Sequence, residues 1–419
     1  MKVLWFTNTP CNYYSGNGIR GYNGGGWLTS LEDELIKRDD ISLGICFCQD
    51  NQLFKAEKNG VVYYPVPRHK KSTKDKILDI IHYKDPKRDE ILWDHYKTVF
   101  KKVIDDFKPD VVHIFGSELY MGLATFVAPC PVVLHIQGLL SLSLYIWFPS
   151  GVSKASYLFQ DWNPKYIYNR FQLYTYWQRS CYREQQVLHH TKHVIGRTHW
   201  DELATEILNP ERVYHYGGEI LRKEFYQEHE RIIPQKLTIV TTSSSPIYKG
   251  FDYVLQTANI LKNVMHRDFE WLVYGNVDPT FHQKFTGLNH SDLSIRLMGV
   301  ASADTLCEAI SHATVYFQPS YIENSPNSVC EAQILGVPVV ATNVGGTASL
   351  LEEGKTGFLV PTNDPYTAAY RIARIKDDTS LNRRIGQQSR IVAQKRHNKN
   401  EIVASLVKTY HDVINNFAH

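Results

Sequence analysis

Several features that mark common classes of protein are scarce or absent in this 419-residue sequence. Lys and Arg total 46 against 43 Asp and Glu, and the net charge of +3 is too small to indicate a nucleic-acid-binding protein. The 7 cysteines are odd in number and scattered, which favours a reducing compartment over a disulfide framework. The first residues form a strand-like run without the regions of a signal peptide, so we expect a cytoplasmic protein.

Long hydrophobic runs are also rare. The most apolar stretch, residues 131–149, reaches the length of a membrane span. It contains His135, Gln137, Gly138 and two serines, so a buried strand followed by a loop is the better interpretation. Internal repeats and low-complexity tracts do not appear in the sequence.

What the sequence does contain is a regular alternation of apolar strands and amphipathic helices. The hydrophobic content of 43% and charged content of 21% are those of a globular protein, and the length is sufficient for two domains. Strands that alternate with helices predict doubly wound parallel sheets, which bind ligands at the carboxyl ends of their strands. The polar segment 227–236, interrupted by Pro234, is the predicted linker between domains at residues 1–228 and 229–399.

The densest concentration of chemistry lies at residues 321–346. Glu323 and Glu331 are separated by seven residues, and a run of Ser, Pro and Asn lies between them. This pattern predicts a loop that leads into a helix, with Ser325 or Asn327 available as the cap, followed by a short buried strand. A helix N-terminus favours a phosphate, whereas carboxylates favour sugar hydroxyls. A nucleotide with sugars on both sides of a diphosphate fits both.

This stretch resembles the signature of the retaining family 4 glycosyltransferases, which have the GT-B fold. The resemblance rests on Glu323 and Glu331 with N-S-P-N-S between them, and on the sequence E-A-Q-I-L-G-V-P-V-V-A-T-N-V-G-G that follows. It implies an α/β protein whose two Rossmann-like, doubly wound parallel-sheet domains face a central cleft, the first binding the acceptor and the second the nucleotide-sugar donor. It also implies that a C-terminal helix, about residues 400–419, packs back on the first domain.

The resemblance implies a role for each glutamate. Glu323 would contact the donor sugar, and Glu331 would hold the ribose. The alternative is a solvated loop and helix in which both acids are incidental. Glu331 argues against that alternative because it opens an otherwise apolar run, where a surface charge has little reason to lie.

Further donor-binding positions follow from the same resemblance. Lys249 and Gly250 match a lysine and a glycine that face the donor diphosphate, whereas Ser243 stands where many members carry an arginine. The hydroxyls of Ser243 and Ser244 would then bind phosphate with less charge neutralisation. The full predicted donor set is Gly24, Gly25, Gly26, Ser243, Ser244, Lys249, Gly250, Met298, Gly299, Val300, Glu323, Asn324, Ser325, Pro326, Asn327, Ser328, Val329 and Glu331.

The first domain supplies the remaining candidates. In the family that the sequence resembles, a histidine at this strand end commonly touches the donor sugar, and this sequence has Gln137 there; glutamine binds hydroxyls but does not take up a proton. Arg197 either clamps phosphate or sugar or forms a structural ion pair with Asp201 or Glu202. The predicted catalytic residues are Glu323, Lys249, Arg197 and Gln137. The predicted acceptor-binding residues are Asn23, Ser117, Glu118 and Gly138.

A glycine-rich first loop offers a competing interpretation. Gly16, Gly18 and Gly21 spell G-x-G-x-x-G, and Asp50 ends the second predicted strand, as in a nicotinamide dinucleotide site. That fingerprint requires the glycines to form a tight turn between strand and helix, and this loop is too long for one. The family resemblance instead places the run Gly24 to Gly26 beside the donor diphosphate.

The segment 145–182 combines thirteen aromatic side chains with four basic residues and a single acid. Such a segment can form an acceptor groove or a contact with a membrane surface. The alternative is a helical packing layer. We therefore expect a glycan or lipid-linked acceptor, and contact with the inner face of the cytoplasmic membrane stays open.

The predicted activity is transfer of a glycosyl unit from a nucleoside diphosphate sugar, with a UDP-sugar favoured and a GDP-sugar next, to an acceptor hydroxyl. Retention at the anomeric carbon is implied by the resemblance alone. No D-x-D pair occurs in the chain, so we expect no metal and no other cofactor. The alternatives are a catalytically silent sugar-nucleotide binding protein and a nicotinamide-dependent oxidoreductase.

Overall fold

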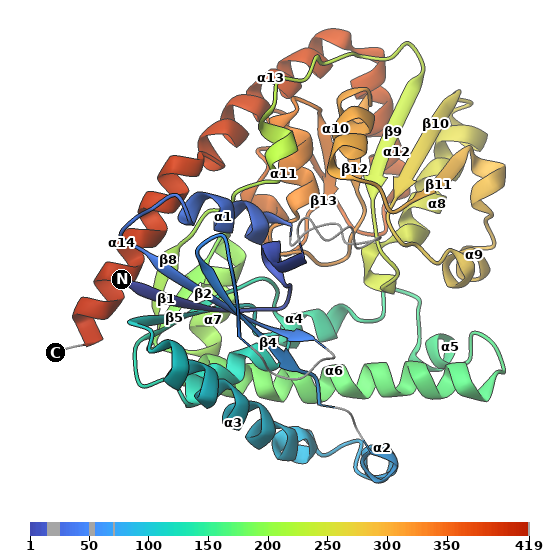
Figure 1. Ribbon diagram of the computed structural model, residues 1–419. Coiled ribbons are helices and arrows are strands. Elements are labelled where there is room, and N and C mark those ends of the chain that lie inside the picture. The colour runs from blue at the N-terminus through green and yellow to red at the C-terminus, as the bar shows by residue number, and fades with distance from the viewer. Residues whose placement is uncertain (15–25, 50–54, 70–71, 418–419) are drawn as a thin grey trace. The chain divides into compact units, whose positions relative to one another are not determined.

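The computed structural model of the chain describes residues 1–14, 26–49, 55–69 and 72–417 (Figure 1). The chain divides into two compact units, each built around one sheet. Unit 1 comprises Met1–Tyr145, Asp161–Ile220 and Lys399–His419, and unit 2 comprises Ile146–Gln160 and Leu221–Asn398.

This division differs from the predicted domain boundary in two segments. Residues 221–228 and 146–160 belong to unit 2, although the sequence placed both in the first domain. The second segment belongs there because Val152 and Tyr157 form a small apolar cluster with Ile247 of unit 2. Apolar packing between residues so far apart in sequence leaves no local signal.

The sheet of unit 1 has eight strands among the described residues, in the order β3-β4-β2-β1-β5-β6-β7-β8. Only β3 pairs antiparallel, with β4, and the other neighbours are parallel. The strands are β1 (Lys2–Thr7), β2 (Ser42–Gln49), β3 (Ala56–Lys58), β4 (Val61–Pro67), β5 (Val111–Phe115), β6 (Val132–His135), β7 (His193–Gly196) and β8 (Val213–Tyr216).

Helices connect these strands and cover the sheet. The α-helices are α1 (Trp27–Leu35), α2 (Thr73–Ile81), α3 (Glu90–Phe107), α4 (Leu140–Ser143), α6 (Pro164–His190), α7 (His199–Leu208) and α14 (Lys399–Phe417). Short helices are η1 (Cys11–Tyr14), η2 (Pro86–Asp89), η3 (Tyr120–Phe126) and η4 (Leu144–Ile146), where the chain passes into unit 2.

Helical periodicity explains how these helices pack. The buried side chains of α3 recur at intervals of three and four residues, which places them on one face toward the sheet. They are Leu92, Trp93, Tyr96, Phe100, Val103, Ile104 and Phe107. The C-terminal helix α14 packs on α1 and β5 (Figure 1), and its buried Tyr410 hydroxyl lies 2.6 Å from Nδ1 of His113.

The sheet of unit 2 is parallel throughout its described strands, in the order β11-β10-β9-β12-β13-β14. Successive residues of β9 face opposite sides, so Ile239 and Val240 belong to two different apolar clusters. Both faces of the sheet are therefore buried, as expected of a parallel sheet. The strands are β9 (Leu237–Thr242), β10 (Phe269–Tyr274), β11 (Ile295–Gly299), β12 (Val315–Gln318), β13 (Val339–Thr342) and β14 (Phe358–Val360).

Helices cover both faces of this second sheet. The α-helices are α5 (Lys154–Leu158), α8 (Phe251–Asn259), α9 (Thr280–Thr286), α10 (Ala303–Ser311), α11 (Asn327–Ile334), α12 (Pro365–Asp377) and α13 (Thr379–Arg396). Shorter turns are η5 (Lys223–Tyr226), η6 (Ile247–Lys249), η7 (Ile260–Val264), η8 (His290–Leu293) and η9 (Gly345–Ser349). No helix in the described ranges has the length and apolar character needed to cross a bilayer.

Candidate active site

The carboxyl ends of β9 and β12 meet where the strand order of the unit 2 sheet reverses. The chain passes from β9 outward through β10 and β11, then continues on the other side of β9 with β12, β13 and β14. At such a switch point the two loops diverge and leave a crevice for a ligand. The loop after β9 carries Ser243 and Lys249, and the loop after β12 carries Glu323.

Lys249 and Glu323 form an ion pair at this switch point, with Nζ and Oε1 2.7 Å apart. Lys249 ends η6, and Gly250, with φ of 75°, leads the chain into α8. A Cβ atom on Gly250 would lie 2.2 Å from the carbonyl oxygen of Pro319. Glycine at this position therefore permits the close approach of the two loops that brings the ion pair together.

One oxygen of Glu323 is held by three donors. Besides Lys249, Oε1 accepts hydrogen bonds from Ser320 Oγ at 2.7 Å and from Gln318 Nε2 at 3.1 Å. The Ser328 hydroxyl orients that amide by donating to Gln318 Oε1 at 3.3 Å. Within the described part of the chain nothing donates to the other carboxylate oxygen, Oε2, which can therefore accept from a ligand hydroxyl.

The Lys249 ammonium remains charged in this setting. Burial disfavours the charged form, but the charge and hydrogen bond of Glu323, together with Tyr248 and Tyr316, outweigh burial and raise the pKa of Lys249 above its ordinary value. The two side chains are only 26% and 12% exposed, so solvent screens them weakly. The site thus presents a fixed positive charge beside an oriented carboxylate.

Two glycines hold the backbone of these loops. Gly345 has φ of 49°, and a Cβ there would lie 2.0 Å from the carbonyl oxygen of Glu323, which Gly346 N contacts at 2.9 Å. Gly275 has φ of 113°, and a Cβ there would lie 1.9 Å from the carbonyl oxygen of Ser243. Both the Glu323 loop and the Ser243 loop therefore depend on a glycine for their position.

Ser243 places an unpaired hydroxyl at the end of β9. Its Oγ is buried and has no hydrogen-bond partner in the described part of the chain, and Ser244 beside it is half-buried. A buried hydroxyl without a partner is costly, and a phosphate oxygen would satisfy it. This orphaned atom supports the predicted use of Ser243 in place of an arginine.

The N-terminus of α11 lies directly after the Glu323 loop. The predicted cap is wrong, because Pro326 occupies the N-cap position and neither Ser325 nor Asn327 does. Proline has no side-chain acceptor for the first N–H groups of the helix, and no side-chain cap bond forms from it. An anion is thus a suitable partner for the positive end of this helix. The predicted donor residues Asn324 and Ser328 also lie in this turn.

Glu331, which also lies on α11, forms an ion pair with Arg222. Arg222 donates to both of its oxygens, Nε to Oε1 and Nη2 to Oε2, each at 2.8 Å. Burial opposes the charge of Arg222, but the bond to Glu331 raises the pKa of the guanidinium above its ordinary value. The pair is local to unit 2 and explains how the buried helix accommodates a carboxylate. Arg222 was not predicted, since no spacing rule links two residues 109 positions apart.

The predicted donor residues Met298, Gly299 and Val300 lie at the end of β11. Met298 and Val300 are 37% and 60% exposed, so this edge of unit 2 is open to a ligand. Gly299, between them, has φ of 72°, and a Cβ atom on it would meet nothing within 4 Å. Its carbonyl oxygen accepts from Gly275 N at 2.8 Å, which ties the segment to the loop after β10.

A second polar cluster lies at the carboxyl ends of the strands in unit 1. Arg197 is 8% exposed, its Nη1 donates to Glu219 Oε2, and its Nη2 donates to the Gln137 carbonyl at 3.2 Å. The Gln137 side chain accepts from Trp27 Nε1 at 3.2 Å. Arg197 and Gln137 are therefore brought together, and Glu219 is a neighbour that sequence reasoning missed.

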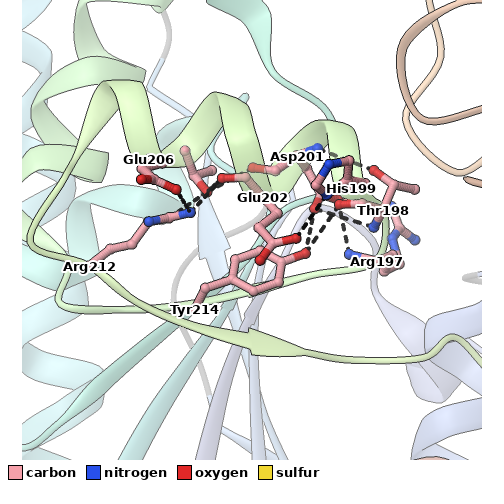
Figure 2. A network of polar contacts seen from close by, with 9 residues as sticks. Arg197, Thr198, His199, Asp201, Glu202, Glu206, Arg212 and Tyr214 are labelled. Atoms are coloured by element: carbon pink, nitrogen blue, oxygen red, sulfur yellow. Dashed lines mark hydrogen bonds and ion pairs between the residues drawn. The ribbon is translucent and has the colours of Figure 1, made fainter.

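Of the two alternatives for Arg197, the structural ion pair with Asp201 or Glu202 does not form, because the guanidinium pairs with Glu219. Figure 2 shows the reason: Asp201 accepts from the backbone N of Arg197 at 2.9 Å and from the hydroxyl of Tyr214 at 2.6 Å. Asp201 also forms a reciprocal cap with Thr198, which begins α7. The carboxylate of Asp201 thus stabilises the start of α7, and the guanidinium of Arg197 pairs with Glu219 instead.

Glu118 lies over two glycines beside this cluster. A Cβ on Gly116 would be 2.1 Å from Glu118 Oε2, and one on Gly138 would be 3.2 Å from Oε1. Burial, with a contribution from the charge of Glu184, raises the pKa of Glu118 to about 7. Oε2 has no partner among the described residues. Of the predicted acceptor residues, Glu118 and Gly138 therefore lie together.

Ser117 has a different environment from the one predicted. It is fully buried and donates to Glu184 Oε1 at 2.8 Å, and Glu184 also accepts from the backbone N of Leu140 and Ser141. The Ser117 hydroxyl thus orients Glu184, whose carboxylate binds the start of α4, and Ser117 has no exposed surface for an acceptor.

Several predicted positions lie outside the described residues. These are Gly24 and Gly25 of the donor set, Asn23 of the acceptor set, and Gly16, Gly18, Gly21 and Asp50 of the alternative nicotinamide site. Gly26 is described and occupies the N-cap of α1 with φ of 59°. No group of three or more His, Cys, Asp or Glu side chains in the described ranges is placed to hold a metal ion.

Solved structures define the fold class to which this architecture belongs. Sucrose-phosphate synthase from Thermosynechococcus elongatus superposes with a TM-score of 0.71 and 15% identity, covering 99% of this chain and 100% of that one. Anabaena HepE, solved in complex with UDP and glucose, gives a TM-score of 0.65 and 14% identity over 98% and 99% of the two chains. The fold is therefore GT-B, with two parallel-sheet α/β domains.

Sequence comparison finds a match to a family model within unit 2. Residues 222–392 match the family described as glycosyl transferases group 1, and this segment contains the Lys249–Glu323 pair. D-inositol 3-phosphate glycosyltransferase from Streptomyces bingchenggensis is 34% identical over 105 residues, which cover 25% of this chain and 23% of that protein. The chain spans about a fifth to a half of the length of the curated relatives it matches.

Proposed function

We propose that this protein is a metal-independent glycosyltransferase that moves a glycosyl unit from a nucleoside diphosphate sugar to an acceptor hydroxyl. The observation that carries the proposal is the ion pair of Lys249 and Glu323 at the switch point of unit 2, beside the N-terminus of α11. A UDP-sugar is the favoured donor, and HepE, which shares the fold, was solved with UDP and glucose. A GDP-sugar is the next candidate.

The donor diphosphate would lie where positive charge gathers. Cleavage of the sugar–phosphate bond leaves additional negative charge on the diphosphate, and catalysis requires groups already placed to stabilise it. Lys249 supplies a full charge, α11 supplies the positive end of a helix, and the unpaired hydroxyl of Ser243 supplies a hydrogen bond. Because Gly250 has no side chain, its backbone would approach a phosphate closely.

The two carboxylates would hold the sugars on either side. Oε2 of Glu323 would accept a hydrogen bond from a hydroxyl of the transferred sugar, because Oε1 is occupied by three donors. Glu331 would accept from the ribose while remaining paired with Arg222. A carboxylate has about four lone-pair directions, so the ion pair and a ribose hydroxyl are compatible.

The proposed stereochemical outcome is retention. Glu323 binds sugar hydroxyls in this scheme and is not the nucleophile, so the acceptor would attack from the same face as the departing phosphate, which takes up its proton. Gln137 would contact the donor sugar without taking part in proton transfer, and Arg197 would position the Gln137 backbone. Glu118 and Gly138 would line the acceptor side. We place the acceptor among cell-surface glycans or lipid-linked oligosaccharides, with peripheral membrane contact as part of the proposal.

The direct test is turnover of a panel of UDP- and GDP-sugars. Release of nucleoside diphosphate and the anomeric configuration of the product would be followed by NMR, with hydrolysis as the reaction when no acceptor is supplied. An axial product from an axial donor supports the proposal. Donor binding with neither transfer nor slow hydrolysis would favour a silent sugar-nucleotide binding protein, which Gln137 and Ser243 keep as the second candidate.

A further inference from the structure

A cavity of unit 2 lies at the C-terminal end of α11. It is open to solvent on one side, has a volume of about 380 Å³ and is lined by the segment after η5, by the turn that follows α11 and by α13. Helix α13 packs directly on α11 (Figure 1). None of the lining residues belongs to the predicted donor set. The cavity is therefore separate from the Lys249–Glu323 site in its residues.

Three arginines, Arg231, Arg383 and Arg390, are among the residues that line this cavity, Arg383 being exposed at its rim, and no Asp or Glu lines it. Surface arginines of a protein with nearly balanced charge are ordinarily interspersed with acids. A cavity that gathers three arginines without one acid has an uncompensated positive potential, which low-dielectric walls strengthen. The remaining polar lining side chains, Asn382 and Gln387, are neutral amides.

Arg231 is committed to the fold. Its Nη1 donates to the carbonyl oxygens of Ile232 at 2.6 Å and Ser311 at 2.9 Å, and its Nη2 donates to Asn382 Oδ1 at 3.4 Å. Burial lowers the pKa of Arg231 to about 10. These acceptors are all neutral, so the guanidinium is hydrogen-bonded but they do not balance its charge.

Arg383 and Arg390 differ from Arg231 because neither forms a hydrogen bond or an ion pair within the described part of the chain. Arg390 is only half-exposed, and its Cδ packs 3.7 Å from the position a Cβ would take on Gly336. The two arginines lie seven residues apart on α13, hence on one face, directed into the same cavity. Their guanidiniums are available to a ligand.

We propose that this cavity binds a phosphate monoester of a small polyhydroxylated molecule. Guanidinium groups match phosphate oxygens with paired hydrogen bonds, and Arg383 and Arg390 supply two such groups from one helix face. The volume is that of a small-molecule site and exceeds what a bare phosphate needs. The amides of Asn382 and Gln387 can bind hydroxyls. The phosphate can belong to a soluble ester or to a lipid headgroup, and both share this chemistry.

Isothermal titration calorimetry on the full chain tests the proposal, with glucose 6-phosphate as the probe and glucose as its neutral counterpart. The test variant is Arg383→Ala/Arg390→Ala. The matched control is Arg384→Ala/Lys395→Ala, which removes the same two charges from α13 at positions that do not line the cavity. Lys249 is intact in every protein, so any phosphate binding at the donor site contributes equally to all three.

The expected result is at least a tenfold weaker Kd for glucose 6-phosphate in the test variant, with wild-type affinity in the control and no binding of glucose. Equal affinity in all three proteins, or equal affinity for glucose, overturns the proposal. Co-sedimentation with vesicles of phosphatidic acid, with phosphatidylcholine vesicles as the control, identifies the source of the phosphate. If the protein binds no soluble ester and only the test variant loses binding to phosphatidic acid, the phosphate belongs to a lipid headgroup. Binding of neither probe by wild type also overturns it.

Discussion

The ammonium of Lys249 lies 2.7 Å from Oε1 of Glu323, although the two residues are 74 positions apart in sequence. The pair joins the loop after β9 to the loop after β12, the two loops of the switch point. Because three donors share one oxygen of Glu323, the carboxylate has a single orientation and directs Oε2 away from them. A ligand that enters this site meets a positive charge and an oriented acceptor together.

Replacing Lys249 with alanine should abolish most of the stabilisation by a nucleoside diphosphate, because it removes the full positive charge that Lys249 supplies to the proposed diphosphate site. A ligand at 100 times its Kd should stabilise the wild type by about 2.7 kcal/mol. Thermal-shift measurements with UDP, GDP, ADP, dTDP and NAD check this. Lys236→Ala, which removes an exposed lysine paired with Asp268, is the control. A shift with NAD alone would overturn the donor assignment.

Glu323→Gln should retain the shape of the side chain and lose its charge. If Oε2 binds the sugar more strongly in the transition state, kcat/KM should fall by about 10²–10³-fold, or about 2.7–4 kcal/mol. Steady-state kinetics with the preferred donor measures this. The control Glu352→Gln, at an exposed carboxylate paired with Lys355, should have normal kinetics. Near-normal turnover of Glu323→Gln would remove Glu323 from the catalytic set.

Gly345→Ala should lower the free energy of unfolding by more than the strain of a positive φ at residue 345 alone would. Its φ of 49° is unfavourable for alanine, and the new Cβ would also lie 2.0 Å from the carbonyl oxygen of Glu323. We expect a loss of about 2–4 kcal/mol from strain and displacement of the Glu323 loop. Gly354→Ala is the matched control, because Gly354 has φ of 71° with nothing within 4 Å. Equal free energies of unfolding for the two variants in urea would refute the steric argument.

Arg222→Ala should destabilise unit 2 by about 3–5 kcal/mol, since it removes the guanidinium that compensates the buried carboxylate of Glu331. The double variant Arg222→Met/Glu331→Leu should recover most of that loss, because an apolar pair needs no charge compensation. Urea unfolding measures both. Donor binding separates the two roles of Glu331: the double variant should fold and yet bind the nucleotide weakly. Unchanged nucleotide affinity in the double variant would limit Glu331 to a structural role.

Glu118 should make the fold less stable as pH rises. Burial raises its pKa from an ordinary value of 4.5 to about 7, so the native state holds a proton that the unfolded chain releases. Its stabilising contribution is complete below about pH 4.5 and is lost between there and about pH 7, amounting to roughly 1–3 kcal/mol.

The measurement is the free energy of unfolding of wild type relative to Glu118→Gln at several pH values between 4 and 8. The difference isolates Glu118 from Glu32, whose carboxyl pKa burial also raises to about 7. The wild type should lose stability relative to the variant as pH rises through this range. A constant difference would show that Glu118 titrates normally.

Local patterns were sufficient for part of the candidate site. Residues 321–346 predicted a loop, a helix and a strand, and the structure has α11 and β13 there. Composition and periodicity predict such elements because secondary structure depends on the backbone preferences of neighbouring residues and on the regular spacing of apolar side chains. The N-cap residue was predicted wrongly because local patterns do not distinguish the adjacent residues Ser325, Pro326 and Asn327. Only the geometry of the folded helix selects among them.

Partners of charged residues were not predictable in this way. Arg222 pairs with Glu331 across 109 positions, and Arg197 pairs with Glu219 instead of the nearer Asp201. Nothing in the spacing of a sequence specifies which of several carboxylates a guanidinium will meet. Desolvation and hydrogen-bond geometry decide that choice, and both arise only after the strands and helices have packed.

By itself the sequence determined the alternation of strands and helices, hence the two parallel sheets, and the residue types at their carboxyl ends, because these depend on short-range periodicity. The tertiary structure alone decided that residues 146–160 belong to unit 2, that one oxygen of Glu323 is occupied and the other open, and that Arg231 shares a cavity with Arg383 and Arg390. Each of these facts depends on contacts between distant segments, whose free energy comes from burial and complementary geometry that exist only in the folded chain.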